Sequence, residues 1–416
     1  MQNNLVSLTR CSDYDLAHVE AAIRHSMDLL GGMGAFVKPG QRVLLKPNLI
    51  RPMPPEKAAC THPAIVAAVA RLVIEAGGRP IIVESPGGPY NPLILRTLYR
   101  KTEMAWAAEI SGAELNYNVG SAQVSHAEGR ILRRLDVVQP LLEADVVINL
   151  PKLKTHNLTT LTLAVKNLFG LVPGALKISY HAKLREVRTF VEGLVDIYTY
   201  VKPALNIMDA VVAMEGNGPS GGDPRPLGVI VAGADALAVD EACTALVGLD
   251  PLRVLTTRLA AERGLTTGRL DDLRLVGEPL ESLRAQSFRL GMVAEIDPGL
   301  MPNKLLGLIR IGNPEASAAD VPGAGTPEGK PRRGWFMTLS SGWVARQLVV
   351  MPSAGEKCIG CGYCAKHCPV GAIRMVNKVA HMDAAKCIRC YCCHELCPET
   401  AVELQRPWLG RLMLGR

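Results

Sequence analysis

Eight cysteines in the last part of the sequence fall into two runs of identical spacing. The first run is Cys358-x2-Cys361-x2-Cys364-x3-Cys368 and the second is Cys387-x2-Cys390-x2-Cys393-x3-Cys397, each followed directly by proline. Three thiolates two residues apart on a tight loop can converge on one metal cluster, and this spacing is the bacterial pattern for 4Fe-4S clusters. The sequence therefore predicts two 4Fe-4S clusters and the handling of single electrons.

The two runs form an internal repeat with an offset of 29 residues, which predicts pseudo-two-fold packing around the clusters. Zinc is the alternative cofactor, because paired Cys-x2-Cys units also occur in zinc ribbons. Four consecutive cysteines ending in Cys-Pro, present twice, favour iron–sulfur clusters instead. Cys392 lies one residue out of register, directly before Cys393. We expect a spare thiol there, although it could compete as a ligand.

This cysteine pattern resembles the dicluster ferredoxins, a family in which the ligands cross over between the two runs. The resemblance implies one cluster held by Cys358, Cys361, Cys364 and Cys397, and a second held by Cys387, Cys390, Cys393 and Cys368.

At 416 residues the chain is long enough for two or three domains. Four further cysteines are scattered, so they indicate free or buried thiols rather than disulfides: Cys11, Cys60, Cys243 and Cys392. The first residues show no signal-peptide pattern, and no apolar run reaches the roughly 18 residues of a membrane span. These features predict a cytoplasmic protein with no membrane span.

The net charge of +7 and an aromatic content of 4% do not suggest a nucleic-acid-binding surface. From Gly355 to Arg416, however, nine Lys and Arg residues face five Asp and Glu residues, a net charge of +4. Positive charge near the clusters favours an acidic redox partner protein. The alternative is a basic face that docks onto the chain's own larger domain.

Short apolar strands alternate with helical patterns over the first 290 residues or so. We expect strands at 42–46, 79–83, 144–150, 204–213 and 227–232, and helices at 62–76, 159–169, 185–201, 236–247 and 251–263. Such alternation predicts an α/β fold with a mostly parallel, doubly wound sheet. The cysteine-rich part adds a small α+β ferredoxin-like dicluster domain.

The expected domains are an α/β domain at 1–312, a Pro/Gly-rich linker at 313–334 and a ferredoxin-like domain at 335–416 with its cysteine core at 355–405. Three tryptophans flank the clusters, and we expect them to cover the clusters or to dock the domains: Trp335, Trp343 and Trp408.

Polar residues follow the predicted strands at the carboxyl edge of the sheet, where ligands of α/β proteins bind. The candidate substrate-binding residues are Lys46, Asn48, Glu84, Lys152, Lys166, Asn167 and Glu215. Lys46, Lys152 and Lys154 together would hold a carboxylate or a phosphate. His156 is the best-placed acid–base group, ahead of His62 and His181, and Lys154 is the second catalytic candidate. A solvated surface position is the alternative for each of these lysines alone.

Several segments of the α/β region together resemble the family called domain of unknown function 362. They are Lys46-Pro-Asn48, Thr61-His-Pro63, Glu84-Ser-Pro86, 149–156, Lys166-Asn-Leu168 with Gly170, and 215–219. The resemblance covers roughly residues 40 to 265, and members of the family often carry a C-terminal dicluster module. It implies a redox role without defining a substrate.

Gly216-x-Gly218-x-x-Gly221 matches the dinucleotide fingerprint, but the residues that follow, Gly222-Asp-Pro-Arg-Pro226, cannot open the helix that a pyrophosphate needs. The leading functional hypothesis is an iron–sulfur oxidoreductase that passes single electrons to or from a small anionic organic substrate. The alternative is an electron-transfer subunit that serves a partner enzyme and has no chemistry of its own. A third hypothesis treats the clusters as structural.

Overall fold

The computed structural model describes residues 4–184, 186–292 and 350–406. The predicted linker at 313–334, the end of the predicted α/β domain, and Trp335, Trp343 and Trp408 lie outside the described residues. Within the described ranges, no helix is long and apolar enough to cross a membrane.

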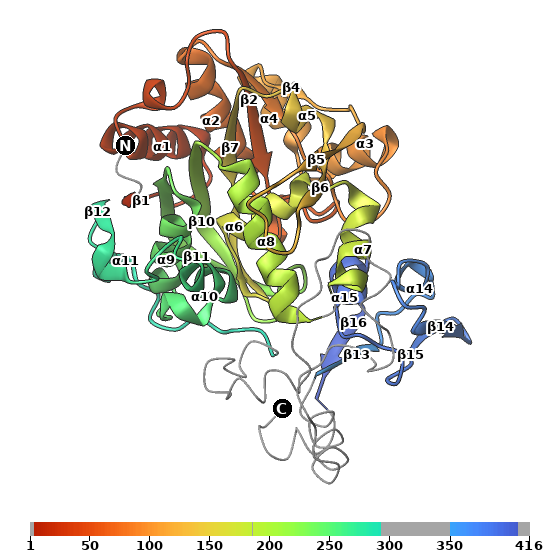
Figure 1. Cartoon of the computed structure of the whole chain (residues 1–416). Coiled ribbons are helices and arrows are strands. Elements are labelled where there is room, and N and C mark those ends of the chain that lie inside the picture. Colours follow the sequence, from red (N-terminus) through yellow and green to blue (C-terminus); the bar gives the residue numbers. More distant parts are fainter. Residues whose placement is uncertain (1–3, 185, 293–349, 407–416) are drawn as a thin grey trace.

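One large sheet organises the N-terminal domain (Figure 1). Its main path is β12 (Arg274–Gly277), β1 (Leu5–Arg10), β11 (Asp223–Gly233), β10 (Leu205–Glu215), β7 (Val146–Leu150), β2 (Arg42–Pro47), β3 (Arg79–Ile82) and β4 (Glu114–Leu115). Neighbouring strands pair in parallel except at β11, which is antiparallel to both β1 and β10. The predicted mostly parallel α/β fold is therefore confirmed.

Alternate residues of each central strand face opposite layers of helices, because side chains alternate across a strand. In β2, Val43 and Leu45 join one core while Leu44 joins another. The first core contains residues of α1 (Leu16–Leu29), α2 (Pro63–Glu75), α3 (Pro92–Lys101) and α4 (Met104–Ser111). The opposite face is covered by α6 (Ala164–Asn167), α8 (Val187–Val201), α9 (Ala236–Leu246) and α10 (Leu255–Glu262).

The predicted strands and most predicted helices are present within a few residues of their expected ends. The helix predicted at 159–169 is wrong: β9 (Thr160–Thr162) precedes α6, and a 3-10 turn at Leu168–Leu171 follows it. β-Branched threonines favour a strand, and β9 pairs antiparallel with β8 (Lys152–His156). β8 itself, predicted only as polar residues beyond a strand end, pairs in parallel with β10.

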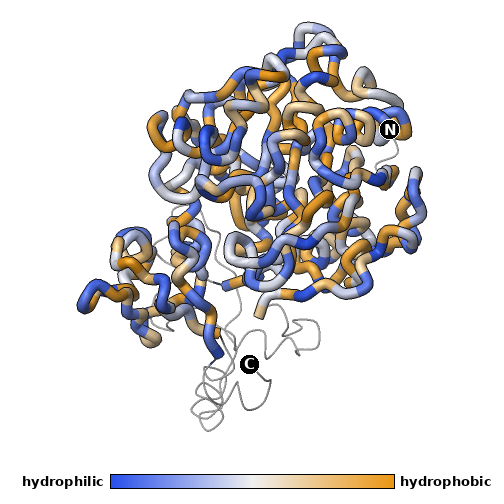
Figure 2. The backbone as a smooth tube through the Cα atoms, turned by 180° about the vertical axis from the view of Figure 1, so that it is seen from behind, coloured by the Kyte–Doolittle hydropathy of each residue, from blue (hydrophilic) through white to orange (hydrophobic). Residues whose placement is uncertain are grey.

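The C-terminal domain repeats a helix and two strands with pseudo-two-fold symmetry. The first half contains β13 (Met351–Ala354), α14 (Tyr363–Lys366) and β14 (Ile373–Val376), and the second contains β15 (Val379–Met382), α15 (Cys392–Leu396) and β16 (Val402–Gln405). β13 pairs with β16 and β14 pairs with β15, so each ladder contains one strand from each half. Figure 2 shows hydrophobic stretches running through both domains.

The two halves have the same left-handed backbone conformation at three equivalent positions but different residue types there. Three positions of the first half have left-handed φ angles and are all glycine: Gly360, Gly362 and Gly371. The equivalent positions 29 residues later have φ between 51° and 58° and are Arg389, Tyr391 and Thr400. A side chain in this conformation costs on the order of 1–2 kcal/mol, so at these three positions the second half holds more backbone strain than the first.

Candidate functional site

The C-terminal domain brings cysteines of both runs together. A small cavity of about 20 Å³ is lined by Cys358, Cys361 and Cys364 of the first run together with Cys397 of the second. A second grouping surrounds Cys393. Burial raises the pKa of this thiol, and four neighbouring thiols raise it further: Cys390, Cys387, Cys364 and Cys368. The pKa of Cys387 is likewise raised by burial and by Cys390 and Cys368. The first grouping is one of the crossed ligand sets that the resemblance implies, whereas the second also includes Cys364 of the other set. The crossed assignment therefore stays a prediction.

Backbone amides donate to the sulfurs at equivalent places in the two halves. The Ala372 N–H donates to Cys368 Sγ and the Ala401 N–H donates to Cys397 Sγ, each at 3.2 Å. Hydrogen bonds of this kind stabilise thiolates and tune the potentials of iron–sulfur clusters. The donor set therefore fits the cofactor.

Among the described residues, no group of three or more His, Cys, Asp or Glu side chains could hold a single metal ion as it stands. A mononuclear zinc site needs four ligands around one atom. A cubane differs, because each thiolate binds a different iron atom at a different corner. The cysteine-lined cavity is the observation that bears on the cluster.

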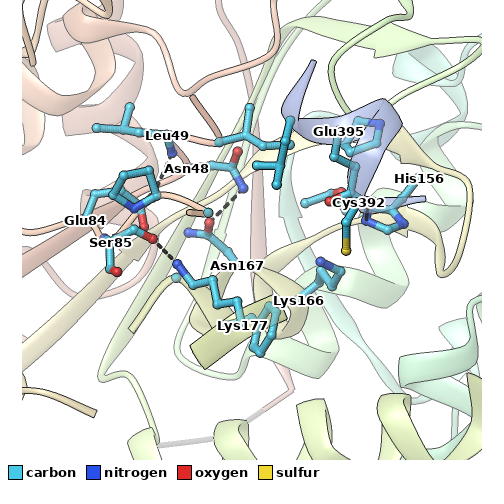
Figure 3. Close-up of a pocket in the computed structure, with 18 of the residues that line it drawn as sticks. Asn48, Leu49, Glu84, Ser85, His156, Lys166, Asn167, Lys177, Cys392 and Glu395 are labelled. Carbon is cyan, nitrogen blue, oxygen red and sulfur yellow. Dashed lines mark hydrogen bonds and ion pairs between the residues drawn. The ribbon is translucent and has the colours of Figure 1, made fainter. Parts of the chain in front are cut away.

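A larger cavity of about 100 Å³ lies where the carboxyl edge of the sheet meets α15 (Figure 3). Six of the predicted site residues line it: Asn48, Glu84, Lys154, His156, Lys166 and Asn167. Residues of α7 (Gly174–Lys183) and of α15 close it, among them Lys177, His181, Cys392 and Glu395. The cavity therefore draws its lining from both domains.

His156 is held as a neutral imidazole with a defined tautomer. Its Nδ1 accepts from the backbone N–H groups of Leu158 and Thr159, at 3.0 and 3.3 Å, so the proton is on Nε2. Nε2 lies 3.2 Å from Glu395 Oε1 without a well-aligned hydrogen bond. Burial lowers the pKa of His156 to about 4, and the positive charge of Lys166 adds to this effect.

Glu395 brings a carboxylate from the C-terminal domain into the cavity. Burial alone raises its pKa, but His156, Lys166 and His181 together outweigh burial and lower the pKa to about 2. The side chain is therefore an anion among cationic and polar groups of the other domain. In the repeat, Glu395 is equivalent to Lys366, which is exposed on α14.

Three lysines of the cavity have no carboxylate within ion-pair distance among the described residues: Lys154, Lys166 and Lys177. Lys154 donates to Asn48 Oδ1 at 2.8 Å and to the Ala59 carbonyl, which leaves its third N–H for the cavity. Lys177 donates to the Ser85 carbonyl. Burial lowers the pKa of Lys154 and of Lys177 to about 7, and it also lowers the pKa of Lys166.

Three other predicted substrate-binding residues do not line this cavity. Lys46 forms a buried ion pair with Glu84 at 2.9 Å, and Lys152 forms one with Asp209 at 2.8 Å. Glu215 pairs instead with Arg289 at 2.9 Å. The two lysines therefore serve as internal counter-ions, because each is already neutralised by a carboxylate that is almost completely buried.

A chain of four asparagines connects Lys154 to the centre of the sheet. Asn48 donates to Asn167 at 2.9 Å, Asn167 donates to Asn149 at 2.8 Å, and Asn149 donates to Asn206 at 2.9 Å. Asn206 donates in turn to the backbone carbonyls of residues 233 and 234. The chain crosses β7 and β10 and fixes the amide that faces Lys154.

Loops at the carboxyl edge of the sheet hold α15 in place. The Ser220 hydroxyl donates to the Glu395 carbonyl at 3.2 Å, and His394 Nε2 lies 3.2 Å from the Asn217 carbonyl. Arg51 donates to the carbonyl of Cys397. A Cβ atom at Gly88 would lie 2.9 Å from Tyr363 Oη on α14, so the loop after β3 approaches the C-terminal domain closely.

Cys392, which the sequence predicts as a spare thiol, lines the larger cavity and is buried. A hydrogen bond with Cys390 raises the pKa of Cys392 and lowers that of Cys390. Cys60 is buried, and burial raises the pKa of its thiol. His62 does not line the cavity; it caps α2 and stacks on Tyr14 with ring centroids 3.6 Å apart.

Sequence reasoning did not single out Lys177 or Glu395 for the site. Lys177 lies on α7, a helix that follows no predicted strand end, so nothing in the pattern marked it. Glu395 had one signal, which is that the repeat places a carboxylate where the first half has a lysine. The difference matters because α15 docks against the sheet edge and places the carboxylate of Glu395 in the cavity.

Comparison with known proteins gives matches to both domains. Residues 43–245 match a family described as domain of unknown function (DUF362), and residues 352–398 match a 4Fe-4S dicluster domain. A thylakoid-associated protein, sll1697, of Synechocystis sp. is 40% identical over 265 residues, which are 62% of this chain and 79% of that protein.

Among solved structures, the lactate racemase apoprotein from Thermoanaerobacterium thermosaccharolyticum matches with a TM-score of 0.37 and 12% identity. The match covers 59% of this chain and 58% of that one, which is less than two thirds of its length.

The sheet domain and the cysteine-rich domain together define an iron–sulfur protein with a 4Fe-4S dicluster domain, a class associated with electron transfer. The chain belongs to the DUF362 family, as the sequence resemblance predicts. The family name assigns no reaction.

Proposed function

We propose that this protein is an oxidoreductase that passes single electrons between two 4Fe-4S clusters and a small anionic organic substrate. The substrate would occupy the cavity between the sheet edge and α15. One observation carries the proposal: the cavity that holds three unpaired lysines is also lined by Cys392 and Glu395, which flank the predicted cluster ligand Cys393 along the chain. When bound, the clusters supply or accept one electron each.

The cavity residues provide a proton donor and groups that stabilise negative charge, both of which such a reaction needs besides electrons. A two-electron reduction of an organic acid also takes up two protons. Lys154, whose pKa is about 7, is suited to donate one of these protons at neutral pH, since an acid works best when its pKa is near the operating pH. The second proton would come from solvent water. The neutral His156 is suited to donate a hydrogen bond from Nε2 to a developing negative charge, and Lys166 to stabilise that charge.

The direct test is reoxidation of the reduced protein by small acids. Anaerobically purified, cluster-loaded protein would be reduced with dithionite, freed of reductant and mixed with a panel of unsaturated or keto organic acids. Recovery of the oxidised cluster absorbance with at least one acid, together with the reduced product, is the expected result. Reoxidation by an acidic carrier protein but by no small acid would support the electron-transfer subunit instead.

That second function has an observation in its favour. Around the cavity lined by cysteines of the first run, Ile359 is 65% exposed and Met375, Val376 and Val379 are 36–39% exposed. The exposed Lys357, Lys366 and Lys378 lie close by in the sequence. An apolar patch with basic residues suits the docking of an acidic carrier protein. The same patch would serve an oxidoreductase as its entry point for electrons, in the reducing compartment that the free thiols predict.

We expect Lys154→Met to slow substrate-dependent reoxidation by about a hundredfold or more, because it removes the proposed acid. Iron content and reduction by dithionite should stay unchanged, since Lys154 touches no cluster ligand. Stopped-flow spectroscopy of the reduced protein measures the rate. Lys202→Met is a control, because Lys202 has a side chain that is 68% exposed. Equal rates for Lys154→Met and the parent protein would remove Lys154 from the mechanism.

Binding of a small anion should weaken as the pH rises above about 7. Lys154 and Lys177 are cationic below their pKa of about 7 and lose that charge above it, whereas a carboxylate ligand stays ionised throughout. For each lysine that must be protonated, affinity should fall about tenfold per pH unit well above that value. Calorimetric titration across this range measures the slope, and Lys154→Met should make it shallower. A flat profile would show that neither lysine titrates in the cavity.

A further inference from the structure

The charges around the cavity do not balance. Lys154, Lys166 and Lys177 contribute three positive charges when protonated, and Glu395 contributes one negative charge. Glu84 also lines the cavity, but Lys46 already neutralises it at 2.9 Å. For Lys46 and the side chains that line the cavity, the remaining excess is two positive charges. Burying unpaired charge is costly, so a ligand that supplies two negative charges would be favoured over one that supplies a single charge.

Two of these three lysines are anchored at different places. Lys177 projects from α7 and donates to the Ser85 carbonyl, which follows β3. Lys154 projects from β8 and donates to Asn48 and Ala59. Lys166 is the one cavity lysine whose charge acts on both of them. Figure 3 shows Lys177 beside Ser85 and Lys166 toward Cys392 and His156.

Lysines that are anchored by different partners favour a ligand with two separate anionic groups. A single phosphate would place both of its charges at one point, whereas a short diacid places one carboxylate near each lysine. The cavity of about 100 Å³ is far smaller than the roughly 300–1,000 Å³ that drug-sized ligands fill, so nucleotides and other large anions do not fit.

Resting on the proposed function, we infer that the substrate is a small dicarboxylic acid that spans the cavity. One carboxylate lies against Lys177, in the place next to Ser85 and the Lys46–Glu84 pair. The other lies against Lys154 and Lys166. The carbon atoms between the carboxylates are then held beside His156 and α15, where electrons would arrive.

The test is binding, measured by calorimetry on the oxidised, cluster-loaded protein without any turnover. The probes are succinate, butyrate, which has the same four carbons and one carboxylate, and inorganic phosphate. Hydrogen bonds to charged partners are stronger than those between neutral groups, so succinate should bind at least about tenfold more tightly than butyrate. Lys177→Met should abolish this preference. Lys183→Met, an exposed position on the same helix, should preserve it.

Equal affinity for succinate and butyrate would overturn the inference, and so would phosphate binding more tightly than succinate. Neither result would touch the proposed function, which is tested separately by reoxidation with small acids. Conversely, tight binding of succinate with no reoxidation by any acid would support the diacid site and count against the oxidoreductase. If Lys177→Met does not fold, Lys177→Gln, which keeps most of the side-chain length without the charge, should show the same loss of preference.

Discussion

Replacing Cys397 with serine is expected to remove the cluster of the first cysteine run, although Cys397 belongs to the second run. The reason is that Cys397 lines one cavity with Cys358, Cys361 and Cys364. Loss of one thiolate of four should leave about half of the iron bound. Iron analysis and electron paramagnetic resonance of the reduced protein measure this, with the signal of the second cluster expected to remain.

Cys368→Ser should give the mirror image, with the second cluster lost and the first retained. Cys392→Ser is the matched control, because Cys392 lies directly beside a predicted ligand and is expected to bind no iron. Should Cys397→Ser abolish the second cluster instead, the ligands would not cross. Loss of iron in Cys392→Ser would make Cys392 a ligand in place of Cys393.

Lys46→Met should destabilise the α/β domain by about 3–5 kcal/mol, because it leaves the carboxylate of Glu84 buried without its counter-ion. The side chain of Lys46 is fully buried and that of Glu84 is 4% exposed. Glu84 also accepts from the backbone N–H groups of Leu49 and Ser85, both at 2.8 Å, so it cannot easily leave. Chemical denaturation of the cluster-loaded protein, followed by far-ultraviolet circular dichroism, measures the free energy of unfolding.

The double variant Lys46→Met with Glu84→Leu shows whether a loss of stability comes from the unpaired charge or from altered packing. Removing both charges together should recover most of the stability, since a buried pair replaced by apolar side chains is often neutral. Lys57→Met, at an exposed position of the same region, should change little. A loss in the double variant as large as in Lys46→Met would point to packing and not to charge.

Hydrophobic pattern predicted the sheet well because its strands are buried on both faces. Segments such as Val146–Leu150 are apolar throughout, and this is the pattern of a parallel strand between two helical layers. The helix predicted at 159–169 was wrong because contacts distant in sequence decided the structure there. Local helical periodicity there was overridden by pairing between β9 and β8, an interaction that depends on the position of β10.

Several residues of the candidate site could be predicted from the sequence, but their ion-pair partners could not. Topology correctly gathers Lys154, His156 and Lys166 at one edge, because successive strand ends meet there. Sequence order cannot tell which lysines find carboxylates, and Lys46 and Lys152 do so through Glu84 and Asp209, 38 and 57 residues away. The contribution of α15 to the cavity could not be predicted either, since α15 belongs to the other domain.

The asparagine chain gives the cavity a direction. Each amide in it donates toward β11 and accepts from the cavity side, and the direction is set where Asn206 donates to two backbone carbonyls. An amide at Asn149 or Asn167 cannot turn over alone, because two donors or two acceptors would then face each other. The oxygen that Asn48 presents to Lys154 is therefore specified from inside the sheet. The acceptor at the cavity end of the chain is therefore set by hydrogen bonds that begin at β11, and not by the residues next to Asn48.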